Sequence, residues 1–498
     1  MSRPNAPDGH DLVVVADRLP IKIVDSGRGG TYRPARAVAG LAALRPVVAA
    51  RHGAWVGWTG HPDTQINAFQ RDDLWLHPIA LSRQEVDDYY RGQCASTLAP
   101  LYHNRVEPPT FRKRWRDAYR EVNQRFAKAT ADIAAPGGVA WVHDYHLQLV
   151  PGQLRRLRPD LLIGFFLHEP FPPAELFVQL PTRTEIISGL LGADLVGFQQ
   201  PAAAATFLDL ANRLLGLPVD DGAVMAGDRR VAVGAFPVPI DAAEVHSLAT
   251  DPHAQAQAAD IRTSLNTPHT IFLAVSRLDQ ADGIEQRLNA YAELLANQQL
   301  DPTHTVLIEV TEPTDADTTR RERLRARIDR RVGQINGDHA RVGHPVVHYT
   351  HRHHALPERV ALYLAADVML ATPLTAGATL PAREFLAART DDAGQLVLSE
   401  FAATDLDGAI MVNPYDPEAL GDAMLAAAAD TRHTPVALTA TRERLHSDSV
   451  EHWAGQFLHA LGTSVAASTR QQHVHARPLP AAQTQPFNHA APSTAGRR

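Results

Sequence analysis

Short apolar runs, each closed by polar residues, recur along the first half of the chain. They lie at 11–16, 53–58, 138–142, 161–167, 195–198 and 231–236. Between them, 83–90 and 111–133 carry apolar residues at helical spacing. Continuous apolar runs of this length are typical of strands that are buried on both faces, so the alternation predicts α/β architecture with a doubly wound parallel sheet.

The same alternation begins again after the segment 237–240 (PVPI), which we interpret as a hinge. Strands are predicted at 270–275, 305–310, 346–349, 368–370 and 395–399, and helices at 286–296 and 318–332. We therefore expect two Rossmann-like domains facing across a cleft. The N-terminal domain would cover 11–237 and the C-terminal domain 238–465, and we expect 1–10 and 466–498 to be disordered.

Length and composition agree with a two-domain protein and exclude several functional classes. The 498 residues exceed what one hydrophobic core supports, and 45% hydrophobic with 21% charged residues is typical of a soluble globular protein. A net charge of −7 gives no basic footprint for nucleic acid. The single cysteine, Cys94, excludes an intrachain disulfide and suits a reducing cytoplasm. We find neither a signal peptide nor a membrane span, so we expect no membrane partner.

The stretch 371–385 (ATPLTAGATLPAREF) joins an apolar strand to a helix through a loop of small residues. Thr379 suits a helix N-cap, Pro381 suits the first turn, and Gly377 allows a ligand to approach the backbone closely. Such a turn can hold an anion or a nucleotide sugar on backbone N–H groups. An ordinary connection between strand and helix explains the same residues.

Two histidines flank Asp144 in the string HDYH at 143–146. No third metal ligand lies nearby in the sequence, so we favour a carboxylate that fixes the loop or binds a sugar hydroxyl, and we predict no metal site. Taken together, these patterns indicate a two-domain α/β protein that transfers a sugar from a nucleotide sugar.

Longer strings in the chain are more specific than these patterns. They include VVVADRLP, GAWVGWTG, WVHDYHLQLVPGQLRRLRPD, IGFFLHEPFPPAELFVQLPTRTEII, GLLGADLVGFQ, VSRLDQADGI, VGHPVVHYTHR, VMLATPL and VNPYDPEAL. With these strings the chain resembles the trehalose-6-phosphate synthase family of retaining glycosyltransferases, from about residue 11 to about residue 461, and its actinobacterial members most.

The resemblance implies a fold of GT-B type and a reaction that moves a hexose from UDP- or GDP-hexose to glucose 6-phosphate with retention. It implies no metal, no cofactor and no protein nucleophile, because the leaving diphosphate helps to take the acceptor proton. Protein groups would then act by positioning and electrostatics.

The resemblance also assigns roles to individual residues. The catalytic groups would be His168, Asp144 and Arg277. The acceptor would be bound by Arg18, Tyr90 and Asp144. The donor would be bound by Gly40, Arg277, Gly377, Thr379, Leu380 and Glu384.

Five positions depart from the family's pattern at three subsites. Asp282 stands where the family has the diphosphate lysine, and Ala376 stands where it has an aspartate for donor-sugar hydroxyls. Asp315 replaces an arginine for the acceptor phosphate, Ala99 an acceptor-side tryptophan, and Ala39 the first of two paired glycines. A carboxylate close to a phosphate costs about as much as a cation there gains, about 4 kcal/mol at 4 Å with an effective dielectric near 20.

We therefore expect the substitutions to weaken or redirect the ordinary activity, and three hypotheses follow. The chain is a working synthase that tolerates them, or a transferase of the same fold with a changed acceptor, such as a cationic one or one without phosphate. Alternatively, it is a non-catalytic paralogue that binds a ligand or pairs with an active synthase as a regulatory subunit. As protein partners we expect a second copy of the chain, in a homo-oligomer, or an active synthase.

Overall fold

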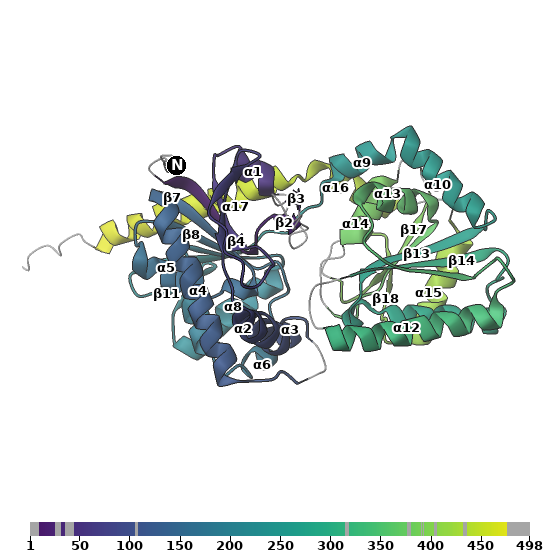
Figure 1. Ribbon diagram of the computed structural model, residues 1–498, viewed down its shortest axis with the longest axis horizontal. Coiled ribbons are helices and arrows are strands. Elements are labelled where there is room, and N and C mark those ends of the chain that lie inside the picture. Colours follow the sequence, from purple (N-terminus) through teal and green to yellow (C-terminus); the bar gives the residue numbers. More distant parts are fainter. Residues whose placement is uncertain are drawn as a thin grey trace, which may run out of the picture.

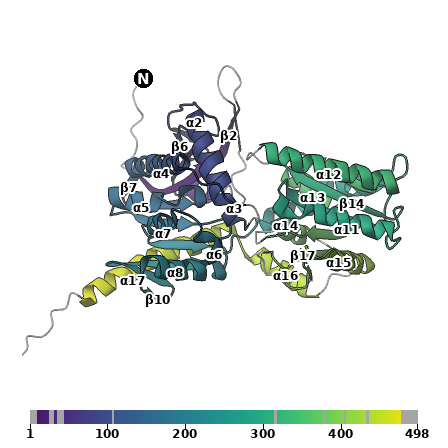
Figure 2. The same ribbon diagram turned by 90° about the horizontal axis from the view of Figure 1, so that it is seen from below.

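The computed structural model describes residues 9–24, 31–34, 44–104, 108–313, 318–375, 380–389, 391, 393–402, 406–431 and 436–475. These residues form two lobes, each built around one main sheet with helices on both of its faces (Figure 1). The lobes lie side by side in both views (Figure 2).

The first lobe contains a ten-stranded sheet whose strands from β12 to β6 run parallel. Its strands, in spatial order, are β10 (Val219–Asp220), β11 (Ala223–Ala226), β12 (Arg229–Ala235), β9 (Leu195–Phe198), β8 (Leu162–Phe166), β7 (Ala134–His143), β1 (His10–Arg18), β4 (Ala54–Trp58), β6 (Leu74–Ile79) and β5 (Phe69–Arg71). A separate antiparallel pair comprises β2 (Ile21–Val24) and β3 (Thr31–Pro34).

The second lobe contains a six-stranded sheet in which every pair is parallel. Its strands, in spatial order, are β15 (Val347–His351), β14 (Thr305–Glu312), β13 (Thr270–Arg277), β16 (Val368–Ala371), β17 (Gln395–Ser399) and β18 (Ile410–Val412).

Helices connect the strands in both lobes. Those of the first are α1 (Arg45–Ala49), α2 (Arg83–Glu85), η2 (Val86–Leu98), α3 (Ala99–Tyr102), α4 (Lys113–Ile133), η3 (Tyr145–Leu147), α5 (Val150–Leu157), α6 (Ala174–Phe177), α7 (Arg183–Leu190) and α8 (Pro201–Leu215). Those that follow are α9 (Ala242–Ala249), α10 (Pro252–Ser264), η4 (Gln280–Asp282), α11 (Ile284–Ala296), α12 (Thr318–His339), α13 (Leu356–Ala365), α14 (Leu380–Ala388), α15 (Pro417–Ala429), α16 (Val436–Ser447) and α17 (Val450–His475).

The central strands of each sheet are buried on both faces, which explains the continuous apolar runs of the sequence. In β1, Val13 and Val15 join one core cluster, while Leu12 and Val14 join the cluster on the opposite face. The strands of the second sheet divide in the same way between two clusters. The predicted doubly wound fold with two parallel sheets is confirmed.

The last helix, α17, corrects the expected course of the chain. Trp453 and Phe457 pack on the first sheet against Trp141 and Phe166, so residues from Val450 onward lie with the first lobe and not with the predicted C-terminal domain 238–465. Figure 1 shows this helix in yellow across the first lobe. It joins that lobe because its apolar face covers aromatic residues of β7 and β8 that would otherwise be exposed.

The predicted disordered ends need a second correction. Residues 466–475 continue α17 as helix, and His10 already belongs to β1. The remaining residues of these two stretches, apart from Gly9, lie outside the described residues. Among the residues that the structure describes, no helix is long and apolar enough to cross a membrane.

Candidate active site

Three of the predicted site residues lie at the carboxyl edge of the first sheet. Arg18 ends β1, Asp144 directly follows β7, and His168 lies just beyond β8. Because β1, β7 and β8 are neighbours and run parallel, these three side chains start from one edge of the sheet. This edge is where ligands bind in open α/β sheets.

Arg18 and Tyr90, both predicted to bind the acceptor, are in direct contact. Arg18 Nε donates a hydrogen bond to Tyr90 Oη at 3.2 Å, and Tyr90 Oη donates to the carboxylate of Asp17. The Arg18 guanidinium also lies over the Trp58 ring, 4.8 Å from its centroid, which is the geometry of a cation–π contact. Burial and the nearby Asp17 charge raise the pKa of Tyr90, so its hydroxyl stays protonated and keeps its hydrogen bond to Asp17.

Asp144 holds a strained turn at the end of β7. Its φ of 71° and ψ of 165° lie in a region that residues other than glycine avoid, at a cost of about 1–3 kcal/mol. The Tyr145 backbone N–H donates to Asp144 Oδ1 at 3.0 Å, and the Asp144 N–H donates to the Phe166 carbonyl at 2.8 Å. Burial raises the pKa of Asp144 well above its usual range, and the charges of Glu169 and Asp17 add to this effect.

His168 is a neutral, buried imidazole. Its Nε2 lies 3.1 Å from His143 Nδ1, and Gln199 Nε2 donates to its carbonyl. Burial lowers the pKa of His168 to about 4, so the ring carries no charge at neutral pH. Among the described residues, its buried Nδ1 has no hydrogen-bond partner. Because buried polar atoms nearly always have a partner, this nitrogen is suited to a ligand hydroxyl.

Glu169, the residue after His168, contacts a basic side chain in each lobe. Its Oε2 lies 3.5 Å from His103 Nδ1 in the first lobe, and its Oε1 lies 3.8 Å from Arg277 Nη1 in the second. Burial alone would raise the pKa of Glu169, but its electrostatic interactions with His103 and Arg277 outweigh that effect and bring the pKa below its usual value. Glu169 is therefore ionised, and its carboxylate links the two lobes.

Arg277 and Asp282 lie together at the carboxyl end of β13. The Arg277 backbone N–H donates to Asp282 Oδ2 at 2.8 Å. Burial raises the pKa of Asp282 to about 6, against the opposing effect of Arg277. The negative charge of Asp282, with that of Glu169, raises the pKa of Arg277. Arg277, whose side chain is 54% exposed, thus has carboxylates from both lobes beside it.

Glu384, the predicted ribose ligand, is held from within the second lobe. Arg359 donates to both of its carboxylate oxygens, at 3.0 and 2.7 Å, and Tyr363 Oη donates to Oε2 at 2.7 Å. These contacts fix the carboxylate near the start of α14, where Leu380 is the first residue and is half-buried.

Ala99, one of the five positions that depart from the family's pattern, is buried in α3 of the first lobe.

The remaining predicted positions lie outside the described residues. They are Ala39, Gly40, Asp315, Ala376, Gly377 and Thr379. Two contacting residues, Asp17 and Glu169, were not singled out in the sequence. The available signal was their position, since each is next to a predicted site residue, Arg18 or His168, at a strand end.

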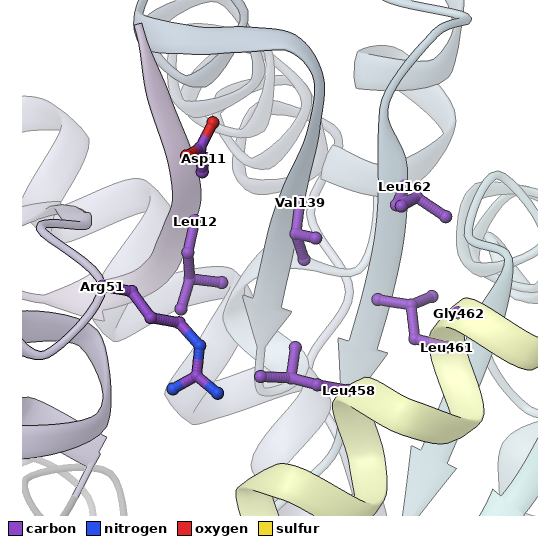
Figure 3. Close-up of a pocket in the computed structure, with 8 residues that line it drawn as sticks. All are labelled: Asp11, Leu12, Arg51, Val139, Leu162, Leu458, Leu461 and Gly462. Carbon is purple, nitrogen blue, oxygen red and sulfur yellow. The ribbon is translucent and has the colours of Figure 1, made fainter.

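Within the described ranges, no group of three or more His, Cys, Asp or Glu side chains could hold a metal ion. A cavity of about 450 Å³ lies between α17 and the amino ends of β1, β7 and β8 (Figure 3). Leu12, Val139 and Leu162 line it, at the opposite end of the strands from Arg18, Asp144 and His168.

Comparison with known proteins shows which sequences this chain is similar to. The trehalose-6-phosphate synthase of Mycobacterium sp. (strain JLS) is 47% identical over 470 residues, covering 92% of this chain and 97% of that protein. The synthase of Mycolicibacterium smegmatis (strain ATCC 700084 / mc(2)155) is 45% identical over 467 residues, covering 91% and 93%.

Solved structures agree over the same length. A UDP-forming α,α-trehalose-phosphate synthase from Burkholderia xenovorans has a TM-score of 0.81 at 27% identity, covering 92% of this chain and 99% of that one. A structure from the same organism in complex with glucose-6-phosphate has a TM-score of 0.80 at 28% identity, covering 91% and 99%. An E. coli structure bound with UDP-2-fluoro glucose has a TM-score of 0.79 at 26% identity, covering 90% and 98%. The family model for glycosyltransferase family 20 matches residues 10–463, so the chain belongs to this family.

Proposed function

We propose that the chain is a trehalose-6-phosphate synthase, which transfers a hexosyl group from UDP- or GDP-hexose to glucose 6-phosphate with retention. Family membership and 45–47% identity to mycobacterial trehalose-6-phosphate synthases over nine-tenths of the chain support this activity. Similar solved proteins are described as UDP-forming, and one was determined in complex with glucose-6-phosphate.

The observation that carries the proposal is the position of Arg277 opposite the strand ends of the first lobe. The Glu169–Arg277 pair, with 3.8 Å between Oε1 and Nη1, brings the end of β13 to the edge that carries Asp144 and His168. A cation from one lobe thus lies near polar groups of the other, as transfer from a diphosphate donor to a sugar acceptor requires.

The proposed roles follow from these contacts and from the family resemblance. Arg18 and Tyr90 bind the acceptor phosphate, and Asp144 orients the acceptor hydroxyls. His168 is neutral, so its free Nδ1 can bond a donor-sugar hydroxyl without adding a charge beside the reacting carbon. The proposed donor ligands are Arg277 for the diphosphate, Glu384 for the ribose, and Gly40, Gly377, Thr379 and Leu380 for loop contacts.

The transfer needs no protein nucleophile under this proposal. The bond between the anomeric carbon and the diphosphate oxygen breaks, and the acceptor hydroxyl attacks from the same face. The departing diphosphate takes the hydroxyl proton. Arg277 stabilises the negative charge that develops on the leaving group, so its electrostatic environment sets the rate.

One observation favours a second candidate function. Asp282 places a carboxylate 2.8 Å from the Arg277 backbone nitrogen, where the family resemblance expects a lysine. A negative charge there opposes a diphosphate and suits either a changed, cationic acceptor or a non-catalytic subunit that pairs with an active synthase.

We propose the cytoplasm as the compartment, which the buried free thiol of Cys94 favours.

Incubation with UDP-glucose or GDP-glucose and glucose 6-phosphate tests the proposal, with the products identified by NMR and mass spectrometry. Formation of an α,α-linked disaccharide phosphate supports the synthase. Nucleotide release that requires another acceptor supports the changed-acceptor transferase. If neither nucleotide sugar raises the melting temperature or reacts, the non-catalytic candidate remains.

A further inference from the structure

Arg287 lies beneath the proposed donor site and is almost completely buried. It belongs to α11, its exposed fraction is 1%, and it pairs with Glu309 of β14, which is fully buried. The pair is bidentate: Nη2 lies 2.6 Å from Oε1, and Nε lies 3.2 Å from Oε2. No residue of this pair belongs to the predicted site.

The other donors of Arg287 reach three separate segments. Nη2 donates to Ser276 Oγ at 3.2 Å, near the end of β13. Nη1 donates to the Asp282 carbonyl at 2.6 Å and to Thr372 Oγ1 at 3.1 Å, just after β16. One guanidinium therefore joins the ends of β13 and β16 to the middle of β14 and uses all of its nitrogens to do so.

The turn after β13 and the loop after β16 also contact each other directly. The Leu374 N–H donates to the Ala281 carbonyl at 2.7 Å. Gly283 has φ +69°, and a Cβ added there would lie 2.2 Å from the Thr372 carbonyl oxygen, so no larger residue fits. Arg277 and Asp282 lie in or beside this turn, and 372–375 leads into the proposed donor loop.

A buried ion pair is a poor source of stability, because desolvating both charges offsets most of their attraction. What the Arg287 pair does supply is a fixed geometry for the two loops. We propose that Arg287 and Glu309 are positioning residues for the donor diphosphate, which they serve by holding Arg277 and the loop after β16 in register. This inference rests on the proposed function.

The test compares Glu309→Gln with Asp367→Asn. Glutamine keeps the size of Glu309 and one acceptor oxygen but removes the charge, which leaves the buried Arg287 without its counter-ion. Asp367 is the matched control. It pairs with Arg262 at 3.1 Å and accepts from the Ile271 N–H at 2.7 Å, at the amino end of the same sheet and away from the donor site. Both variants should lower the melting temperature.

Only Glu309→Gln should weaken UDP binding, by about tenfold or more, and raise the KM for UDP-glucose while the KM for glucose 6-phosphate changes little. Arg287→Lys, which keeps the charge but loses the fork, should behave like Glu309→Gln. Equal UDP affinity in Glu309→Gln and Asp367→Asn would overturn the inference, because the pair would then support only the fold.

A ligand-free measurement separates this inference from the proposed function. Amide hydrogen exchange at Leu374 and Gly283 should be faster in Glu309→Gln than in Asp367→Asn, whether or not the chain binds a nucleotide. If the unmodified chain binds no UDP or GDP, the synthase proposal fails. Faster exchange in Glu309→Gln would then still support the inference that the Arg287–Glu309 pair holds the two loops in register. Unchanged exchange at both amides would overturn this inference.

Discussion

Glu169 Oε1 lies 3.8 Å from Nη1 of Arg277, and this ion pair joins the edge of the first sheet to the end of β13 in the second. Asp282 binds the backbone of the same arginine. The guanidinium that we assign to the donor diphosphate therefore pairs with one internal carboxylate, Glu169, and is also influenced by the negative charge of Asp282. A diphosphate has to compete with Glu169 and be accommodated beside Asp282.

Replacing Glu169 with glutamine should strengthen nucleotide binding. The variant removes the carboxylate that competes from the opposite lobe, and because Arg277 is half-exposed, solvent screening limits the gain to about two- to fivefold in the Kd for UDP. Titration calorimetry at low salt measures this change, and Glu175→Gln, at an exposed position of α6, is the control. An unchanged Kd in Glu169→Gln would mean that this carboxylate does not compete with the ligand.

Asp282→Lys should have a larger effect on the same affinity. The substitution exchanges a negative charge for a positive one next to the proposed diphosphate site, so we expect the Kd for UDP to fall by about tenfold or more. Asp282→Asn, which only removes the charge, should have a Kd for UDP between those of the wild type and Asp282→Lys. Combined with Ala376→Asp and Asp315→Arg, the lysine variant should raise synthase turnover. An inert triple variant would show that the chain has diverged at other positions as well.

The affinity for UDP-glucose should depend on pH through Asp282. Burial holds its pKa at about 6, so the carboxyl becomes neutral as the pH falls from about 7.5 to about 5.5, and donor binding should tighten. Arg277, Asp279 and Arg287 act on this carboxyl but do not reverse the direction of the shift. The diphosphate of UDP-glucose does not titrate in this range, so Asp282→Asn should flatten the profile. A profile that is the same in the variant would assign the titration to another group.

Asp282 also makes the stability of the fold depend on pH, in the opposite direction from most acidic groups. Its folded pKa lies above the usual value for aspartate, so the folded state binds the proton more tightly than the unfolded state. The stability that it contributes is present below about pH 4 and is lost as the pH rises through about 6. Urea unfolding at several pH values measures how the unfolding free energies of the wild type and Asp282→Asn differ as the pH changes. This pH-dependent difference should vanish if the carboxyl is already ionised at about pH 5.

Helix α17 should be essential to the first lobe. Trp453 Nε1 donates to the Phe236 carbonyl at 3.0 Å, and the Phe457 ring stacks on Trp141 with 4.6 Å between centroids. Trp453→Ala should therefore cost about 3–5 kcal/mol of unfolding free energy. His459→Ala, at an exposed position of the same helix, should change it by less than about 0.5 kcal/mol. Similar values for the two variants would contradict the packing described here.

Much of the fold could be predicted because the strands are buried on both faces. The runs at 195–198 and 395–399 coincide with β9 and β17, and the other predicted strands overlap the observed ones. The edge strands β5 and β10 were missed because their half-exposed or exposed residues lack an apolar run. The return of α17 to the first lobe could not be predicted, since helical periodicity does not say which sheet the apolar face covers.

The site was predictable only where residues stand at strand ends or match the family strings. Arg18, Asp144 and His168 lie at one edge of the first sheet for that reason, and Arg277 reaches that edge from the other sheet through Glu169. The contact between Glu169 and Arg277 joins residues far apart in the sequence, so no local pattern could indicate it. The Arg287–Glu309 pair was missed because, although Glu309 lies inside the predicted strand 305–310, no local pattern indicates that Arg287 of the preceding helix is buried beside it.

The most direct test is the rate of trehalose 6-phosphate formation by the unmodified chain as a function of donor concentration. We predict that the product forms from a nucleoside-diphosphate glucose and glucose 6-phosphate, with a donor KM that Asp282→Lys lowers by about tenfold or more. No product at any donor concentration, or a donor KM that Asp282→Lys leaves unchanged, would contradict this account.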